Sequence, residues 1–160
     1  MKGILLWLVA IGAAYGQSFH YSTVYNATVS SSAAVLTVQQ PATPIVHAIL
    51  RSVSIYCSVA CTVQVERDGS AATATAGTAA SSTQEAPSAG VLVFTGSNVG
   101  SGTILSQAFQ VSAGTSILVN LAGLEMLKAQ PRNYSFRTNS ISGTVQMTLL
   151  WDEVERTNGQ

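Results

Sequence analysis

The sequence has little charge. Only 9% of its 160 residues are charged and the formal net charge is zero, whereas an average globular protein has about 25% charged residues. Lysine and arginine form no cluster, so nucleic acid and acidic membrane surfaces have no basic patch to bind. Because charged residues are depleted at the cores of interfaces, this composition fits a protein whose faces are covered by neighbouring subunits.

Cysteine and histidine are also scarce, with two residues of each. Cys57 and Cys61 lie close together in the chain, and in an oxidising compartment such a pair is expected to form a disulfide. The same pair could be half of a metal site. The sequence has no further cysteine, and its only histidines are His20 and His47. We therefore expect no metal and no cofactor.

Long apolar runs are absent. Ile4–Ile11 is uninterrupted but too short to cross a bilayer as a helix, which takes about 20 residues. It follows Lys2 and precedes Ala14-Tyr15-Gly16, which is the layout of a secretory signal peptide. We predict a leader at 1–16, a mature chain from Gln17 and a secreted, periplasmic or cell-surface location without a membrane anchor. An uncleaved anchor or a buried core segment is the alternative.

What the chain does contain is a series of short alternating segments typical of strands. In Phe19–Val29 the large residues share one face, and Val24 is the exception. The mostly apolar Ile45–Tyr56 predicts a strand near the middle of a sandwich. Leu124–Lys128 is the single segment that suggests a helical turn. The other predicted strands are Val35–Gln39, Thr62–Arg67, Val91–Thr95, Thr103–Val111, Ile117–Leu121, one around Tyr134 and Phe136, and Thr144–Trp151.

Eight or nine such strands predict an all-β fold, an antiparallel β-sandwich. We expect a jelly roll, with an immunoglobulin-like sandwich as the alternative. The domain should span 17–151, with a polar tail at 152–160. Residues 70–90 are Ala, Thr, Ser and Gly with almost no large apolar side chain, and predict a flexible loop. The alternative is a loop that orders against a partner.

Motifs for catalysis are not evident. His47 sits in a predicted buried strand and His20 near the mature N-terminus, and neither has the context of a nucleophile–base pair. Asp152, Glu153 and Glu155 could supply half of a calcium site, but a solvated strand end is the simpler interpretation. We therefore expect a protein that is not an enzyme, with a concealed hydrolase site as the remote alternative.

Two glycosylation sequons are present, at Asn26 and Asn133. Both lie in predicted strands, and they matter only if the protein passes through a glycosylating export pathway.

Two functions remain. The first is a secreted structural or assembly protein that forms a homo-oligomer, because low charge and open strand edges both favour association. The second is a monomeric extracellular adhesion module that binds a glycan or a surface protein through its loops.

Overall fold

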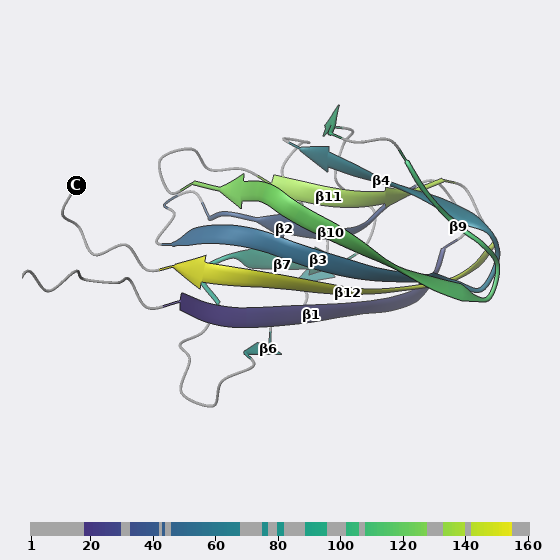
Figure 1. The fold of residues 1–160 in the computed structure, drawn as a ribbon, viewed down its shortest axis with the longest axis horizontal. Helices are drawn as coiled ribbons and strands as arrows, with labels where there is room; N and C mark the ends of the chain where they lie inside the picture. Colours follow the sequence, from purple (N-terminus) through teal and green to yellow (C-terminus); the bar gives the residue numbers. More distant parts are fainter. Residues whose placement is uncertain are drawn as a thin grey trace, which may run out of the picture.

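The computed structural model describes residues 18–29, 33–41, 43, 46–67, 75–76, 80–81, 89–95, 102–105, 108–127, 133–139 and 142–154. These residues form two antiparallel sheets that pack face to face, a β-sandwich (Figure 1). The predicted all-β sandwich is therefore confirmed. The described residues contain no helix, and thus none long and apolar enough to cross a membrane.

Sheet A is built from the long strands of the chain. Its order is β10-β3-β12-β1-β6, so β10 forms one edge and the short β6 the other. The bounds are β1 Ser18–Val29, β3 His47–Cys57, β6 Ala80–Ser81, β10 Thr115–Met126 and β12 Gly143–Val154. The strand β12 runs past the expected boundary at 151 because Asp152 and Glu153 still pair with His20 and Phe19 of β1.

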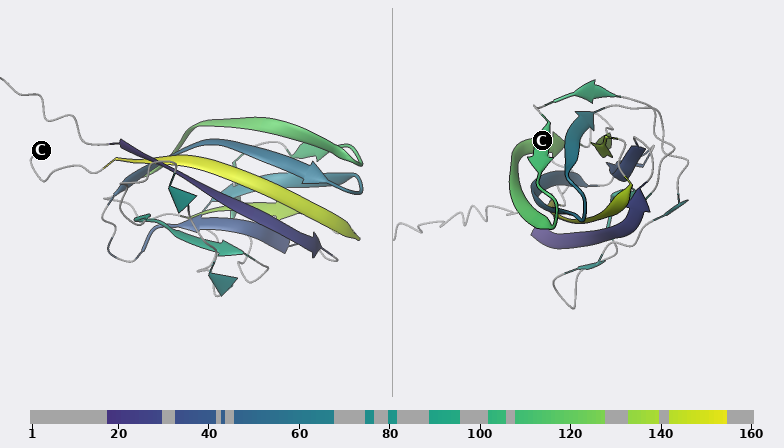
Figure 2. Two further views of the ribbon diagram at one scale, coloured as in Figure 1. Left: turned by 90° about the horizontal axis from the view of Figure 1, so that it is seen from below. Right: turned by 90° about the vertical axis from the view of Figure 1, so that its right-hand side faces the viewer.

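Sheet B has the order β5-β7-β2-β11-β4-β8, and β9 also pairs with β4. Both sheets curve around a common core when the molecule is seen from the side and end-on (Figure 2). The bounds are β2 Ala33–Gln39, β4 Cys61–Arg67, β5 Thr75–Ala76, β7 Leu92–Thr95, β8 Thr103–Ile104, β9 Phe109–Val111 and β11 Asn133–Thr138.

The inner faces supply the core, in which aromatic and branched side chains from both sheets meet. Tyr21 of β1 stacks on Trp151 of β12, with ring centroids 5.8 Å apart and planes inclined by 21°. The largest fully buried side chains are Trp151, Phe136, Leu36, Leu50, Ile55, Met126, Met147 and Leu149. The period-2 pattern of Thr144–Trp151 correctly placed Met147, Leu149 and Trp151 on one inward face.

Two local expectations differ from the structure. The helical turn expected at Leu124–Lys128 is wrong, because Leu124–Met126 continues β10 and pairs with β3 as far as Ala48. Where one strand was expected over Thr103–Val111, two short strands, β8 and β9, pair separately with β4. Short apolar segments fit either helix or strand locally, and pairing with a long neighbour decides between them.

The expected flexible loop at 70–90 contributes to both sheets where it is described. β5 pairs with Phe94 and Thr95 of β7, and β6 pairs with Tyr21 and Ser22 of β1. The segment thus adds one short strand to an edge of each sheet. Other residues of the loop lie outside the described part, including 82–88.

Candidate functional site

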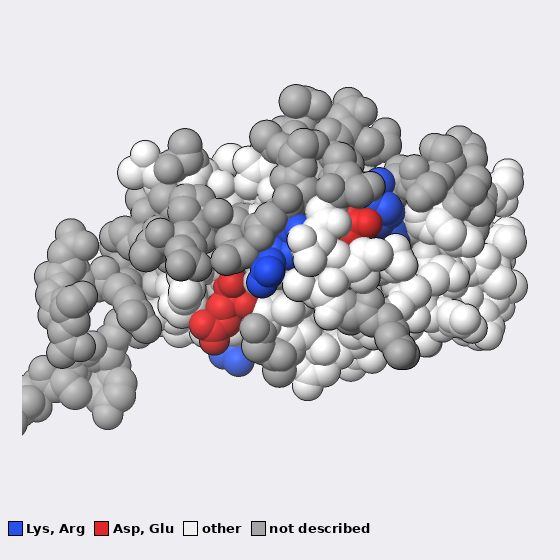
Figure 3. All heavy atoms as spheres, turned by 90° about the horizontal axis from the view of Figure 1, so that it is seen from above, with Lys and Arg blue, Asp and Glu red and all other residues white. Residues whose placement is uncertain are grey.

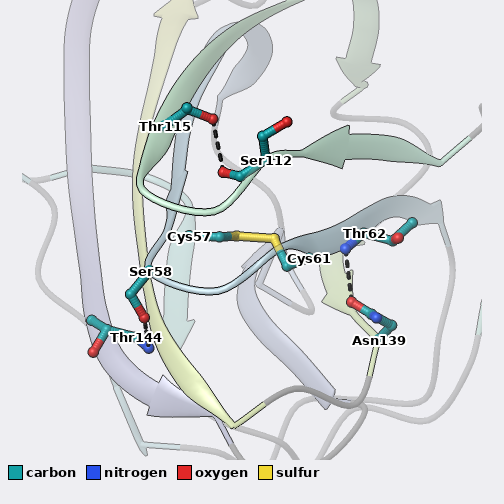
Figure 4. Close-up of a disulfide and its surroundings, with 8 residues drawn as sticks. All are labelled: Cys57, Ser58, Cys61, Thr62, Ser112, Thr115, Asn139 and Thr144. Atoms are coloured by element: carbon teal, nitrogen blue, oxygen red, sulfur yellow. Dashed lines mark hydrogen bonds between the residues drawn. A yellow bond between two sulfur atoms is a disulfide. The ribbon is translucent and has the colours of Figure 1, made fainter.

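A disulfide closes the turn between β3 and β4, which joins the two sheets at one end of the sandwich (Figure 4). The Cys57 and Cys61 Cα atoms are 6.1 Å apart, and both side chains are buried. Hydrogen bonds support the same turn: the Thr144 amide donates to Ser58 Oγ at 2.8 Å and the Thr62 amide to Asn139 Oδ1 at 2.7 Å. The predicted pair is confirmed, and it stabilises a turn.

Charged residues meet at the opposite end of sheet A, on its outer face. Asp152 lies between His20 of β1 and Arg51 of β3: His20 Nδ1 is 2.5 Å from Asp152 Oδ1, and Arg51 Nε donates to Asp152 Oδ2 at 2.5 Å. A register shift makes this possible. Leu150 pairs with Ser52 and Trp151 with Leu50, so Arg51 is the extra residue of a β-bulge.

His47 and Glu125 form a second pair on the same end, with His47 Nε2 3.1 Å from Glu125 Oε2. The His47 side chain is buried whereas that of Glu125 is largely exposed. His47 is thus a buried, hydrogen-bonded histidine, as its strand pattern predicts. We call the five residues His20, His47, Arg51, Glu125 and Asp152 the charged end.

Glu153 points to the other side of sheet A, into the sandwich. It accepts hydrogen bonds from the Gly90 amide at 2.7 Å, the Val91 amide at 3.2 Å and Trp151 Nε1 at 2.9 Å. Burial raises the pKa of the nearby Tyr21 hydroxyl above its usual value of 10.0, and the Glu153 carboxylate raises it further.

The expectation of a solvated strand end at Asp152 and Glu153 is therefore wrong. Both residues are almost completely buried, and apart from the neighbouring Trp151 their partners come from three other segments of the chain. Spacing along the sequence gave no sign of those partners. The third acid of this group, Glu155, lies outside the described residues.

A further buried carboxylate lies in sheet B. Both Glu66 oxygens accept from Arg137 Nε at 2.9 Å, and Oε2 also accepts from the Gly102 amide at 3.2 Å. In Figure 3 the charged side chains visible on that side lie in small groups in which opposite charges are adjacent.

Beside the charged end lies an area of the outer face of sheet A, across β10, β3, β12 and β1, that has no charged side chain. Strand pairing places twelve outward residues in three rows of four across β10, β3, β12 and β1. We call these twelve residues the neutral face. The rows are Ser116, Tyr56, Gln146 and Asn26; Leu118, Ser54, Thr148 and Val24; and Asn120, Ser52, Leu150 and Ser22.

Three aliphatic side chains stand out from this face. Leu118 is 74% exposed, Val24 64% and Leu150 44%. Leu118 and Val24 lie in the same row, on the strands at its two ends, and Leu150 lies in the next row. Val24 is the residue that broke the alternation of its strand in the sequence, which was the available signal for this surface.

The two sequons occupy contrasting places. Asn26 is exposed and belongs to the neutral face. Asn133 is buried at the start of β11, between β2 and β4. Only the Asn26 side chain is therefore accessible in the folded protein.

For chemistry, the arrangement offers an Asp152 carboxylate that contacts His20 and Arg51, and a Glu153 carboxylate held by N–H donors. Among the described residues, no group of three or more Cys, His, Asp or Glu side chains could hold a metal ion. A shallow hollow beside the disulfide is lined by Thr62, Gln110 and Ser112 among others, and no ionisable side chain lines it. No family model matches the chain, and no curated protein matches its sequence.

Proposed function

We propose that this protein is a secreted, non-enzymatic structural subunit that associates with further copies of itself through the neutral face of sheet A. The observation that carries the proposal is the combination of twelve outward positions without a charge and three exposed aliphatic side chains. Water is displaced from such a surface at little cost, because no charge has to be desolvated.

The size of the face agrees with association. Four strands at about 4.8 Å and six residues at about 3.4 Å outline a rectangle on the order of 400 Å². Three of its twelve side chains are exposed aliphatic groups and most of the others are polar. A stable interface takes about 800 Å² per partner, so we expect association that strengthens with concentration.

Secretion rests on the predicted leader and is supported by the Cys57–Cys61 disulfide, since such bonds persist in oxidising compartments. The expected mature N-terminus is Gln17. Export in a secretory host followed by N-terminal sequencing tests this, and a mature protein that still begins at Met1 would refute the leader.

For the finer fold class we infer a jelly roll. Its support is the strand order: β1, β3, β10 and β12 lie in sheet A whereas β2, β4, β9 and β11 lie in sheet B. The chain therefore crosses between the sheets at nearly every long connection. These eight strands, four in each sheet, match the eight strands of a jelly roll, and β5, β6, β7 and β8 add to the sheets.

The experiment that tests assembly is light scattering of the purified, oxidised mature chain over a dilution series. The proposal expects a mass that rises with concentration and changes little between low and high ionic strength, because the neutral face has no charges to screen. A Val24→Lys, Leu150→Lys double variant should shift the series toward monomer.

A constant monomer mass at every concentration would refute self-assembly and favour the alternative, a monomeric adhesion module that binds a glycan or a surface protein. The double variant needs a control for general effects of added charge. Thr103→Lys serves this purpose, since Thr103 is also exposed but lies on β8 of sheet B.

A further inference from the structure

The strand β10 ends sheet A, and among the described residues no strand pairs with its outer edge. In Figure 1 it forms the upper border of the front sheet. An edge strand presents a row of backbone donors and acceptors that can pair with another chain. We propose that β10 pairs antiparallel with β10 of a second copy, about a twofold axis that passes beside Leu118. This inference rests on the proposed self-assembly and names the contact that starts it.

The sequence of β10 lacks the features that protect an edge. From Thr115 to Leu124 it has no charged residue and no proline, and these are the usual means of blocking edge-to-edge pairing. Pairing with β3 is regular from Thr115 to Asn120, and the register shift comes only after Asn120. The first half of β10 is therefore a regularly paired segment, without a bulge, that another strand can join.

Self-pairing brings no like charges together, which removes the usual cost of matching a strand with its own copy. The first charged residue of the strand is Glu125, and it lies beyond the register shift. The second copy is consequently a partner to which this edge is electrostatically suited.

Symmetry limits the register. A twofold axis perpendicular to the sheet keeps the outer faces on the same side, so an outward residue must lie opposite an outward residue. When the axis passes beside Leu118, this side chain lies opposite its own copy, and Ser116 lies opposite Asn120 of the second copy. The most exposed large apolar side chain of the described residues is then covered by an identical side chain.

The neighbouring register fits less well. With the axis beside Ile117, Leu118 would lie opposite Ser116 of the second copy and stay next to a polar group. Registers shifted further bring either the turn at Gly114, where φ is 68°, or the irregular stretch after Asn120 into the pair. Apolar matching therefore selects the axis beside Leu118.

The contact is small. Five residues of strand span about 17 Å, and an edge of this length covers far less than the roughly 800 Å² per partner of a standard interface. We expect a dimer that dissociates on dilution. Although the contact is small, it would join the five strands of sheet A in each copy into one sheet of ten strands. The two neutral faces would then form one continuous surface.

Cysteine cross-linking tests the register directly. Opposite residues of an antiparallel pair have Cα atoms about 4.5–5.5 Å apart, within the roughly 4.4–6.8 Å that a disulfide takes. Leu118→Cys should therefore give a covalent dimer on a non-reducing gel under mild oxidation. Ser116→Cys is the matched control, since its copy would lie about 14 Å away along the strand. Val24→Cys, on the same face but near the other edge, measures cross-linking by random collision.

The expected result is a several-fold excess of dimer for Leu118→Cys over both controls, in protein whose circular dichroism matches the wild type. Equal cross-linking of the three variants overturns the inference, and so does stronger cross-linking of Ile117→Cys, which indicates the other register. If the wild type still self-associates by light scattering in those cases, the proposed assembly stands and uses another contact. A wild type that stays monomeric throughout refutes both.

Discussion

Replacing Glu153 by glutamine should destabilise the protein by about 2–4 kcal/mol, a large part of the roughly 5–15 kcal/mol that holds a typical domain folded. The side chain is 2% exposed and nearly the same size as glutamine, so packing changes little. What changes is the hydrogen bonding inside the sandwich.

The geometry gives the magnitude. One carboxylate oxygen accepts from the Gly90 amide, and the other accepts from the Val91 amide and Trp151 Nε1. A glutamine has one acceptor oxygen, so its NH₂ group must face at least one buried N–H. A buried donor left without a partner costs about 1–3 kcal/mol, and the bonds that remain lose the extra strength of a charged acceptor. The smaller desolvation cost of a neutral amide opposes these losses and sets the upper limit.

Urea denaturation followed by tryptophan fluorescence measures the effect, since Trp151 is the single tryptophan after Trp7 of the predicted leader. The control is Glu125→Gln, which alters an exposed carboxylate with one partner and should change the free energy of unfolding by less than about 1 kcal/mol. If the two variants unfold at the same urea concentration, the argument about buried donors is wrong.

Further predictions concern backbone approach, the disulfide and pH. Gly90→Ala should cost about 1–3 kcal/mol of stability by urea denaturation, because the new Cβ would lie 2.7 Å from a valine methyl group; no loss would contradict this close approach. Replacing Cys57 and Cys61 by alanine should lower the free energy of unfolding, measured by urea denaturation, by about 2 kcal/mol, the value for a disulfide that closes a short loop. A variant that does not fold would show that the disulfide contributes more than this. Burial raises the pKa of Tyr21 and Tyr25 above 10.0, so stability should be full below pH 10 and decline as the pH rises beyond it. Phenylalanine at both tyrosine positions should flatten that decline in urea titrations at pH 8 and pH 11.

Most of the fold could be predicted from the sequence because each long strand has one buried face. The alternation in β1 and β12 places Tyr21, Tyr25, Met147 and Trp151 inward, where the structure has them. Local pattern was less informative where strands are two or three residues long, as in β5, β6 and β8. Such pieces become strands through pairing with a neighbour rather than through their own composition.

The charged end could not be predicted, for a different reason. Asp152 meets His20 and Arg51, which are more than a hundred residues away in the chain, and the contact depends on a bulge that turns Arg51 to the outer face. A bulge is not marked by any residue type here. The neutral face did leave a signal, since Val24 interrupts the polar side of its strand, but a single apolar residue on an exposed strand face is common.

The few charges of this chain explain why so much of its surface has none. Of the four acidic residues that the structure describes, Glu66, Asp152 and Glu153 are buried. Asp152 accepts a hydrogen bond from Arg51, and Glu66 accepts one from Arg137. Charge that would otherwise keep copies apart in solution is thus used to join strands and loops within one molecule. The neutral face and the first half of β10 carry no charged side chain that would repel a second copy, and they adjoin each other because β10 belongs to both. Under the proposed self-assembly, association is directed rather than prevented, and Leu118, in the regularly paired half of the edge strand β10, would give it one preferred register.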